Sequence, residues 1–570
     1  MNLKFWALLL LSATLAMACS GESNDAAATA DGGGGGAGAK DASAAADSSD
    51  KPDATGDAAV SQDGSPAADA AVPDASPPPP EPDYYVTPTG KASNDGKTEQ
   101  TAWSLDHAFA TAKAGDAVYV KAGLYADFTI TQNGNGTSEN PIQFIGYTST
   151  PGDINPHAQT SYSLGTQTIQ VLASFAHGDK VDASKMPLLR ENRSGSVGSG
   201  TALVINGDYV VLNNLQFQYY EAGMRVSGDH CQLTNLIFTE QGDFASDAYS
   251  GKGVYNYGND NHYKNIYVEN SGAQNFSIRG NGGTYDAISV VSDNTTNPTD
   301  YYFLFQEGHD NTATNIYVHR VGQLAHDGHG IVYKTPSPCY NNNVTGFIID
   351  NTNLEIQFPG VHDNTVKNGY VFRPLSEASI TGAGARLANG AYDCTIDNVF
   401  FENCLVRFCD WPDGLAGDAA DSADGFVFNR ITVINAQSAV AFNYFKQGYF
   451  SSSADNNTFY NSTFYGASWH YELSRANSNT KFVNCIFSDI PKYSFSTGGS
   501  PGYPADVSYS SVNFFNYAPA VPSGTNVTTA DPKFVDPKNY DFSLGTGSTL
   551  KGKGIATPFL PAGNDIGSYQ

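Results

Sequence analysis

A short pattern of polar and apolar residues recurs along most of the chain. Each copy begins with polar residues, usually including an asparagine, and continues with apolar residues at alternating positions. The clear copies are NNLQF (213–217), TNLIF (234–238), KNIYV (264–268), TNIYV (314–318), DNVFF (397–401), NRITV (429–433) and VNCIF (483–487), and the weaker ones are DAISV (286–290), TGFII (345–349), NGYVF (368–372) and NSTFY (461–465). Alternation of this kind is typical of a β-strand with one buried face. The pattern therefore predicts a long series of similar strands.

The spacing of the copies indicates how these strands are connected. Successive copies follow every 21 to 32 residues, with no gap in the series. This interval is too short for a βαβ unit with a full crossover helix. It fits one coil of a parallel β-helix in which each coil carries about three short strands. Asparagine and glycine tolerate left-handed backbone at the corners, and stacked asparagines would hydrogen bond along the axis.

A second series of short alternating segments follows the first, once per coil. These segments are GMRVS (223–227), GVYNY (253–257), FSIRG (276–280), FLFQE (303–307), IVYKT (331–335), LEIQF (354–358), ARL (385–387), VRF (406–408), VAFNY (440–444) and YELS (471–474). If their apolar residues point inward, the outward residues are Arg225, Arg279, Gln306, Lys334, Glu355, Gln357, Arg386, Arg407, Asn443 and Glu472. Such a face is rich in arginine. Arg279 is then expected two coils below Lys334 and Arg386 two coils above it, each about 10 Å away by strand spacing.

The first 83 residues have a different composition. Residues 1–19 combine Lys4, a short apolar run and Ala16-Met17-Ala18-Cys19, which predicts a secretory signal peptide of lipoprotein type with a lipid anchor on Cys19. Residues 20–83 hold thirteen acidic residues against two lysines and have no aromatic residue. Such an acidic Ala/Gly/Pro linker is expected to be disordered. The protein is therefore expected to be exported to the cell envelope, either as an outer-membrane lipoprotein or as a secreted protein.

Charge and cysteine content limit what the structured part, residues 84–570, can do. Its net charge is −17, since the whole chain carries −27, the linker −11 and residues 1–19 carry +1. This acidity argues against nucleic-acid binding, which needs a basic surface. The six cysteines after Cys19 form no CxxC pair, so a zinc site is not expected and burial in the core is the simplest interpretation. We expect a monomer.

Both ends of this part resemble a known group of proteins. Residues 84–125 contain a first strand, a helix near Trp103 to Lys113 and the strand GDAVYVKAGLY; residues 531–544 read DPKFVDPKNYDFSL, and the chain ends in DIGSYQ. These segments resemble secreted right-handed parallel β-helix proteins of the pectate-lyase-like superfamily. The resemblance implies an all-β solenoid with a short N-terminal capping helix. The superfamily includes polysaccharide lyases, glycoside hydrolases, epimerases and binding proteins, so the fold alone does not decide the activity.

The basic groups of the outward face, on an otherwise acidic domain, suit an anionic glycan chain. Together with the resemblance, they predict a polysaccharide lyase acting on an acidic glycan. Elimination requires removal of the C5 proton of a uronic acid, while arginine or calcium neutralises the adjacent carboxylate. Some families use a strand lysine as base and calcium held by acidic residues. Lys334 would then be the base, Arg279 or Arg386 the neutralising group, and Glu307 with Glu355 the calcium ligands.

Other assignments remain open from the sequence. Glu355 would favour the charged form of Lys334, so His326 or His329 is a rival base. Substrate binding is expected from Arg225, Gln357, Arg407, Asn443 and Trp411. A glycoside hydrolase would instead pair Glu355 with Asp410 or Asp363. A third possibility is a surface protein that binds glycan without catalysis.

Overall fold

The computed structural model describes residues 80–568, except for 155–158, 165–166, 173–180, 193–199, 243–249, 294–298, 323–327, 374–382, 409–421, 443–453, 474–477, 493 and 496–505. The expected signal peptide and most of the expected linker thus lie outside the described residues. Of the linker, Pro80 and Asp83 already bond to one strand, Ala117–Lys121: Tyr119 Oη donates to Pro80 O at 2.7 Å, and Asp83 Oδ2 accepts from Ala117 N at 3.0 Å. Among the described residues, no helix has the length and apolar character needed to cross a membrane.

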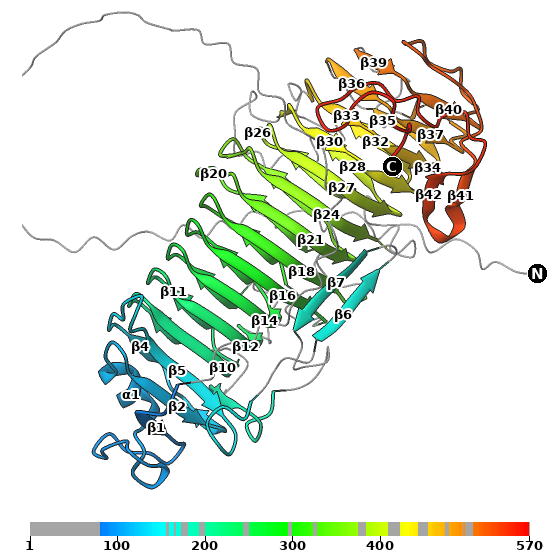
Figure 1. The fold of residues 1–570 in the computed structure, drawn as a ribbon. Coiled ribbons are helices and arrows are strands. Elements are labelled where there is room, and N and C mark those ends of the chain that lie inside the picture. Colours follow the sequence, from blue (N-terminus) through cyan, green and yellow to red (C-terminus); the bar gives the residue numbers. More distant parts are fainter. Residues whose placement is uncertain are drawn as a thin grey trace, which may run out of the picture. The chain divides into compact units, whose positions relative to one another are not determined.

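Nearly all described elements are strands (Figure 1). The largest sheet has 21 strands: β1 (Tyr84–Val86), β2 (Ala117–Lys121), β3 (Gly123–Ala126), β5 (Ile142–Tyr147), β8 (Pro187–Arg190), β10 (Val210–Gln218), β12 (Gln232–Gln241), β14 (His262–Ser271), β16 (Thr284–Ser292), β18 (Thr312–Arg320), β21 (Asn343–Asp350), β24 (Thr365–Phe372), β27 (Thr395–Glu402), β30 (Val427–Asn429), β31 (Thr432–Ile434), β33 (Thr458–Tyr460), β34 (Thr463–Tyr465), β36 (Thr480–Val483), β37 (Ile486–Ser488), β39 (Val507–Ser510) and β40 (Asn513–Phe515). The second has 13: β4 (Ile130–Gln132), β9 (Thr201–Ile205), β11 (Ala222–Val226), β13 (Lys252–Asn256), β15 (Gln274–Ile278), β17 (Tyr301–Phe305), β19 (His329–Lys334), β22 (Leu354–Gln357), β25 (Ala383–Ala388), β28 (Leu405–Phe408), β32 (Ser438–Phe442), β35 (Trp469–Leu473) and β38 (Ser494–Phe495).

The remaining elements are few. A four-stranded sheet contains β20 (Cys339–Tyr340), β23 (Val361–His362), β26 (Ala391–Tyr392) and β29 (Ala423–Asp424). Two antiparallel hairpins are β6 (Gln159–Leu164) with β7 (Gln167–Leu172), and β41 (Phe534–Asp536) with β42 (Asp541–Leu544). The helices of the described residues are α1 (Leu105–Thr111) and the short 3₁₀ segments η1 (Glu99–Thr101) and η3 (Pro537–Asn539).

The strands stack as successive coils of a parallel β-helix, which confirms the predicted fold class. In the large sheet, β10, β12, β14, β16 and β18 pair in chain order, and all these pairings are parallel. In the second sheet, β11, β13, β15, β17 and β19 do the same. Each coil therefore contributes one strand to each sheet, and neighbours along the axis are residues one coil apart in the sequence.

Recurring asparagines mark a bend inside most of the long strands; Ala287 of β16 and Gly346 of β21 have positive φ at the equivalent position. Asn214, Asn235, Asn265 and Asn315 all have positive φ, between 55° and 61°. Asparagine tolerates this left-handed conformation better than most residues. The bend divides one strand into two short segments, so that a coil carries three short strands in two sheets, as the repeat length predicted.

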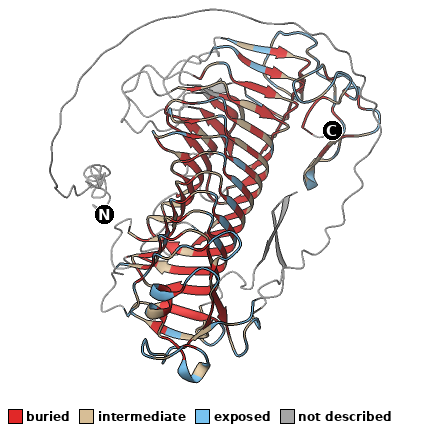
Figure 2. Ribbon diagram, turned by 60° about the vertical axis from the view of Figure 1, so that its left-hand side comes forward, coloured by how far each residue is buried: buried red, intermediate tan, exposed pale blue. Residues whose placement is uncertain are grey.

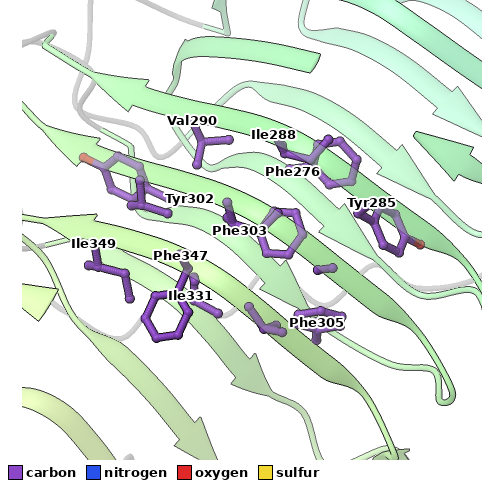
Figure 3. Packing of buried hydrophobic residues seen from close by; sticks show 14 of the residues in the cluster. Phe276, Tyr285, Ile288, Val290, Tyr302, Phe303, Phe305, Ile331, Phe347 and Ile349 are labelled. Atoms are coloured by element: carbon purple, nitrogen blue, oxygen red, sulfur yellow. The ribbon is translucent and has the colours of Figure 1, made fainter. Parts of the chain in front are cut away.

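The apolar alternation fills the interior of the coils. Figure 2 shows that the stacked strands are mostly buried. Behind the second sheet, Phe276, Phe303 and Ile331 occupy equivalent positions on β15, β17 and β19, and none has exposed surface. Figure 3 shows these side chains packed together in the interior. Five cysteines, Cys231, Cys339, Cys394, Cys404 and Cys485, are buried and unpaired among the described residues, which agrees with a core role; Cys409 lies outside them.

Helix α1 lies near the first coil, as the resemblance implied. Its residues Leu105, Ala108 and Phe109 are buried, and the Phe109 ring stacks on Phe144 of β5 with centroids 3.8 Å apart. These apolar contacts place the helix against the first coils of the stack.

Asparagine side chains form ladders along the axis, as predicted. In one ladder, Asn265 Nδ2 donates to Asn235 Oδ1 at 2.7 Å. A second ladder is buried at the corner before the large sheet, where Asn342 Oδ1 accepts from Asn311 Nδ2 at 2.9 Å and Asn342 Nδ2 donates to Asn364 Oδ1 at 3.0 Å. Each amide thereby satisfies polar groups of two neighbouring coils in the interior.

We expect Asn342→Ala to destabilise the protein by about 1–3 kcal/mol, because it leaves the buried Asn311 N–H without its acceptor, Asn342 Oδ1, and Gly308 O without its donor, Asn342 Nδ2. The measurement is the midpoint of urea unfolding followed by circular dichroism. Asn343→Ala is the matched control, since Asn343 is exposed at the next position, and its effect should stay within about 0.5 kcal/mol. Equal midpoints for the two variants would show that the ladder contributes nothing specific.

Candidate functional site

The second sheet carries the predicted outward residues. The ten segments of the second series coincide with β11, β13, β15, β17, β19, β22, β25, β28, β32 and β35. The register pairs Val332 with Glu355, and Glu355 with Arg386. Glu355 thus lies one coil from Lys334, and Arg386 two coils from it, as the sequence predicted.

The outward residues do not form a single file, and this corrects the expected alignment. One column contains Arg225, Tyr255, Ser277, Leu304, Val332, Glu355, Arg386 and Arg407. Lys334 pairs with Gln357 and belongs to the next column, two residues further along each strand. Arg279 follows Ile278, whose column reaches Phe305 and Tyr333, so Arg279 lies in the Lys334 column. The sequence shows alternation but not which outward position of one coil faces which position of the next.

Glu355 is the centre of a buried polar cluster. Its side chain has no exposed surface. Oε1 accepts from Arg386 Nη1 at 2.9 Å and lies 2.7 Å from His329 Nδ1. Two amides complete the shell: Asn353 Nδ2 donates to Oε1 at 3.2 Å and Gln357 Nε2 donates to Oε2 at 3.1 Å. A buried carboxylate with this number of donors is fully satisfied.

The cluster keeps Glu355 ionised. Burial alone would raise the pKa of this carboxyl, but the charges of His329 and Arg386, the hydrogen bond from His329 and the charge of Lys334 together hold the pKa well below its ordinary value. A carboxyl in this state is an acceptor only. It cannot serve as a general acid, and both oxygens are already engaged.

His329 is fixed on both sides. Since the ionised Glu355 can only accept, Nδ1 of His329 carries the proton of that hydrogen bond. The other ring nitrogen, Nε2, lies 3.5 Å from Asp300 Oδ1, and the ring stacks on Tyr301 at a centroid distance of 4.8 Å. These contacts orient the imidazole. Both ring nitrogens therefore face carboxylates.

Lys334 is the half-buried cation at the end of β19. Its Nζ lies over the Tyr301 ring, 5.6 Å from the centroid. Burial raises the pKa of the Tyr301 phenol to about 12 although Lys334 acts to lower it. The phenol is therefore neutral at physiological pH. Tyr301 positions the ammonium group of Lys334 beside the Glu355 cluster.

Arg279 is the accessible arginine of the Lys334 column. Its Nε donates to Gln306 Oε1 at 3.1 Å, and its Nη1 lies 3.3 Å from Glu307 Oε1. Its side chain is 30% exposed, whereas that of Arg386 is 11% exposed and bonded to the buried Glu355. Arg279 is therefore the better placed of the two to meet a substrate carboxylate.

The other predicted binding residues differ in their surroundings. Arg225 is exposed, as expected of a binding residue. Gln357 is 3% exposed and bonds Glu355 and Asn389, and Arg407 has no exposed surface. The structure therefore does not favour direct contact of Gln357 and Arg407 with substrate, because both side chains are buried within the coils. Asn443 and Trp411, like His326 and Asp410, lie outside the described residues.

The contacts of Glu307 and Glu355 do not suit a shared calcium site. Calcium needs six to eight oxygen ligands with most carboxylate oxygens free to coordinate it. Glu355 is engaged by cations and amides, and Glu307 faces Arg279. Within the described part of the chain, no group of three or more His, Cys, Asp or Glu side chains is arranged to hold a metal ion. Calcium remains a prediction that these contacts do not support.

The sequence analysis did not identify three residues of the cluster. Tyr301 and Asp300 precede the apolar core of β17, and Asn353 precedes β22. The register places Tyr301 opposite His329, one coil away. The segment DYYFLFQE could have indicated this contact, because aligning it with HGIVYK places Tyr301 opposite His329.

Comparison with known proteins agrees with the fold. Residues 100–311, somewhat over a third of the chain, match the family model of Chondroitinase B. This range contains Arg225, Arg279 and Glu307 but ends before Lys334, Glu355 and Arg386. A search of curated proteins finds no match.

Several solved structures are similar at low sequence identity. Pectate lyase Pel9A is 14% identical, with 85% of this chain and 96% of that chain covered and a TM-score of 0.33. The PL6 family alginate lyase AlyGC is 13% identical, with 80% of this chain and 58% of that chain covered and a TM-score of 0.48. A mannuronic acid specific family 6 lyase from human gut microbiota is 14% identical, with 74% and 82% covered and a TM-score of 0.38. Because these scores are low, the fold assignment here rests on the strand pairing of the chain itself.

Proposed function

We propose that this protein is a polysaccharide lyase that cleaves an acidic, uronic-acid glycan by β-elimination. The observation that carries the proposal is the pairing of two accessible cations, Lys334 and Arg279, in one outward column beside a buried carboxylate that other groups neutralise. The domain around this column is acidic, with a net charge of −17 obtained from the chain total of −27. A local basic column on such a surface attracts an anionic chain. The match of residues 100–311 to the Chondroitinase B model supports the same class.

In this proposal each side chain has one task. Arg279 neutralises the uronate carboxylate, which makes the C5 proton more acidic. Lys334, in its neutral form, takes that proton; the electron pair forms the C4–C5 double bond, the C4–O bond breaks, and the leaving oxygen takes up a proton. Arg386 and His329 hold Glu355, and Tyr301 orients Lys334.

The structure weakens the objection that Glu355 must keep Lys334 charged. Arg386 Nη1 and His329 Nδ1 both lie within 2.9 Å of Glu355 Oε1 and act against the charge of this carboxylate. The carboxylate is therefore a smaller obstacle to deprotonation of Lys334 than an unpaired acid at the same position would be.

A glycoside hydrolase receives less support. It needs a carboxyl pair on either side of a bond, one of them able to donate a proton. Glu355 is buried with a pKa held low, and Asp363 lies beside β23 in another sheet, 58% exposed and 2.7 Å from His362 Nδ1. These two carboxyls do not share one site on the second sheet.

The test is an assay of the purified protein on polygalacturonate, alginate and chondroitin sulfate, with and without added calcium. A rise in ultraviolet absorbance from an unsaturated product supports elimination. New reducing ends without that absorbance would show hydrolysis instead. Glycan binding without either product would indicate a protein that binds glycan without cleaving it.

We also infer export and a lipid anchor on Cys19, a proposal supported by residues 1–19 alone. Intact-mass analysis of the protein from its native membrane tests it. A mature N-terminus beyond Cys19, without lipid, would contradict the anchor.

A further inference from the structure

A second feature of the same sheet lies away from Lys334. Tyr257 follows β13 and is 39% exposed. The guanidinium carbon of Arg225 lies 5.2 Å from the centre of the Tyr257 ring, and that of Arg279 lies at the same distance. Arg225 belongs to β11 and Arg279 follows β15, the two neighbours of β13. One exposed tyrosine is therefore flanked by an arginine from each adjacent coil, and we refer to these three residues as the arginine clamp.

The clamp has an excess of positive charge. Among the described residues, Arg225 makes no ion pair, while Arg279 has one, with Glu307 at 3.3 Å. Lys252 adds a third cation, since its Nζ lies 5.1 Å from the centre of the Tyr255 ring, which packs on Tyr257 at 6.1 Å. Contacts with the tyrosine rings hold the cations in place without neutralising them. On an acidic domain, this arrangement leaves room for an anionic ligand.

The chemistry of the clamp selects the type of anion. Guanidinium groups bind carboxylate or sulfate through two parallel hydrogen bonds, and their planar shape also stacks on aromatic rings. Because a guanidinium from each neighbouring coil lies over Tyr257, the ligand meets guanidinium N–H groups rather than an open ring face. These are the N–H groups of Arg225 and those of Arg279 that Gln306 and Glu307 do not engage. The clamp thus fits the charged substituent of an acidic sugar better than the apolar face of a neutral sugar.

The clamp is aligned with the proposed reactive centre. Tyr257, Arg279, Gln306 and Lys334 occupy successive coils in one outward column. With about 4.8 Å per coil, Tyr257 lies about 14 Å from Lys334 along the axis, and Arg225 about 19 Å. A glycan chain that lies along the stacking axis would contact both places at once.

We infer that the clamp of Arg225, Tyr257 and Arg279 is a distal binding site for an anionic sugar residue of the same glycan chain that reacts at Lys334. The part of the inference that links the clamp to a reaction at Lys334 rests on the proposed function. The binding itself depends only on the clamp. Arg279 takes part in both sites: it is the proposed neutralising group near Lys334, and it is the member of the clamp that lies nearest to Lys334 along the axis.

The test uses Arg225→Ala and Tyr257→Ala, with Lys264→Ala as matched control. Lys264 is an exposed lysine of β14 in the other large sheet, so its loss removes one positive charge outside the clamp. On long polygalacturonate, alginate or chondroitin sulfate chains, Arg225→Ala should raise KM about tenfold, the loss of one charge-assisted contact, with kcat unchanged. On oligosaccharides too short to reach from Lys334 to Tyr257, Arg225→Ala and the natural protein should have the same KM.

A binding measurement separates this inference from the lyase proposal. Native affinity electrophoresis in gels containing each glycan, with neutral dextran as reference, measures retention without any reaction. Weaker retention of Arg225→Ala and Tyr257→Ala than of Lys264→Ala supports the clamp even if no glycan is cleaved. Retention on alginate and polygalacturonate assigns carboxylate as the ligand, and retention on chondroitin sulfate alone assigns sulfate. Equal retention of all variants, or no retention of the natural protein on any acidic glycan, would overturn the inference.

Discussion

Lys334→Ala is expected to lower kcat for elimination by about 10²–10⁴-fold, the usual contribution of a positioned general base. Lys334 is half-buried at the end of a strand, so its truncation should leave the fold intact. The measurement is the initial rate of absorbance increase on the glycan that the natural protein cleaves, together with a urea unfolding curve for each variant.

Two further variants identify the base. Lys334→Arg keeps the positive charge but does not give up its proton at accessible pH, so glycan retention should survive while kcat falls as in Lys334→Ala. His329→Gln should reduce kcat less, since His329 is expected to orient Glu355 rather than accept the C5 proton. A full loss of activity in His329→Gln with substantial activity in Lys334→Ala would transfer the base role to the histidine.

Glu355→Ala is expected to destabilise the protein by about 3–5 kcal/mol, because it leaves Arg386 and His329 facing each other without the buried carboxylate between them. The unfolding midpoint in urea at pH 7 measures the effect. Glu307→Gln is the matched control: Glu307 is the 41% exposed partner of Arg279, and a surface pair of this kind contributes about 0–1 kcal/mol. A midpoint for Glu355→Ala close to that of the control would show that the cluster is not needed for stability.

The same carboxylate predicts a pH dependence. The pKa of Glu355 in the folded protein is held below the ordinary value of 4.5. Its stabilising contribution is therefore complete above pH 4.5 and decreases as the pH falls below that value toward the folded pKa. The difference in midpoint between the natural protein and Glu355→Gln should be constant from pH 6 to 7 and become smaller below about pH 4.5. A difference that grows on acidification would contradict this assignment.

The fold could be predicted because its determinants are local and repeated. Left-handed asparagines such as those at 214, 235 and 265 recur in most coils, and alternating apolar residues follow them. A repeat stacks only on its neighbours, so the spacing of the copies sets the length of one coil. The second series of strands could be aligned for the same reason, with the inward residues Ile331 and Tyr333 correctly placed.

The sequence predicted several residues of the site but not how these residues contact one another. The sequence identified Lys334, Glu355 and Arg386 on three successive coils, and the pairing of β19, β22 and β25 places them so. The sequence did not show that Glu355 is entirely buried or that His329 binds it. It also missed Tyr301 and Tyr257, because an aromatic residue next to an apolar strand has the same appearance whether it packs inside or holds a cation outside.

The sequence by itself determined that this chain forms a stack of short parallel strands with an arginine-rich outward face, since alternation and repeat length are properties of neighbouring residues. Only the tertiary structure decided which outward residues meet. Register between coils depends on where each connecting segment ends, and a shift of two residues moves a side chain such as Arg386 from the column of Lys334 to that of Glu355. Burial was likewise a tertiary property, because the same outward position is exposed at Arg225 and completely covered at Glu355 and Arg407.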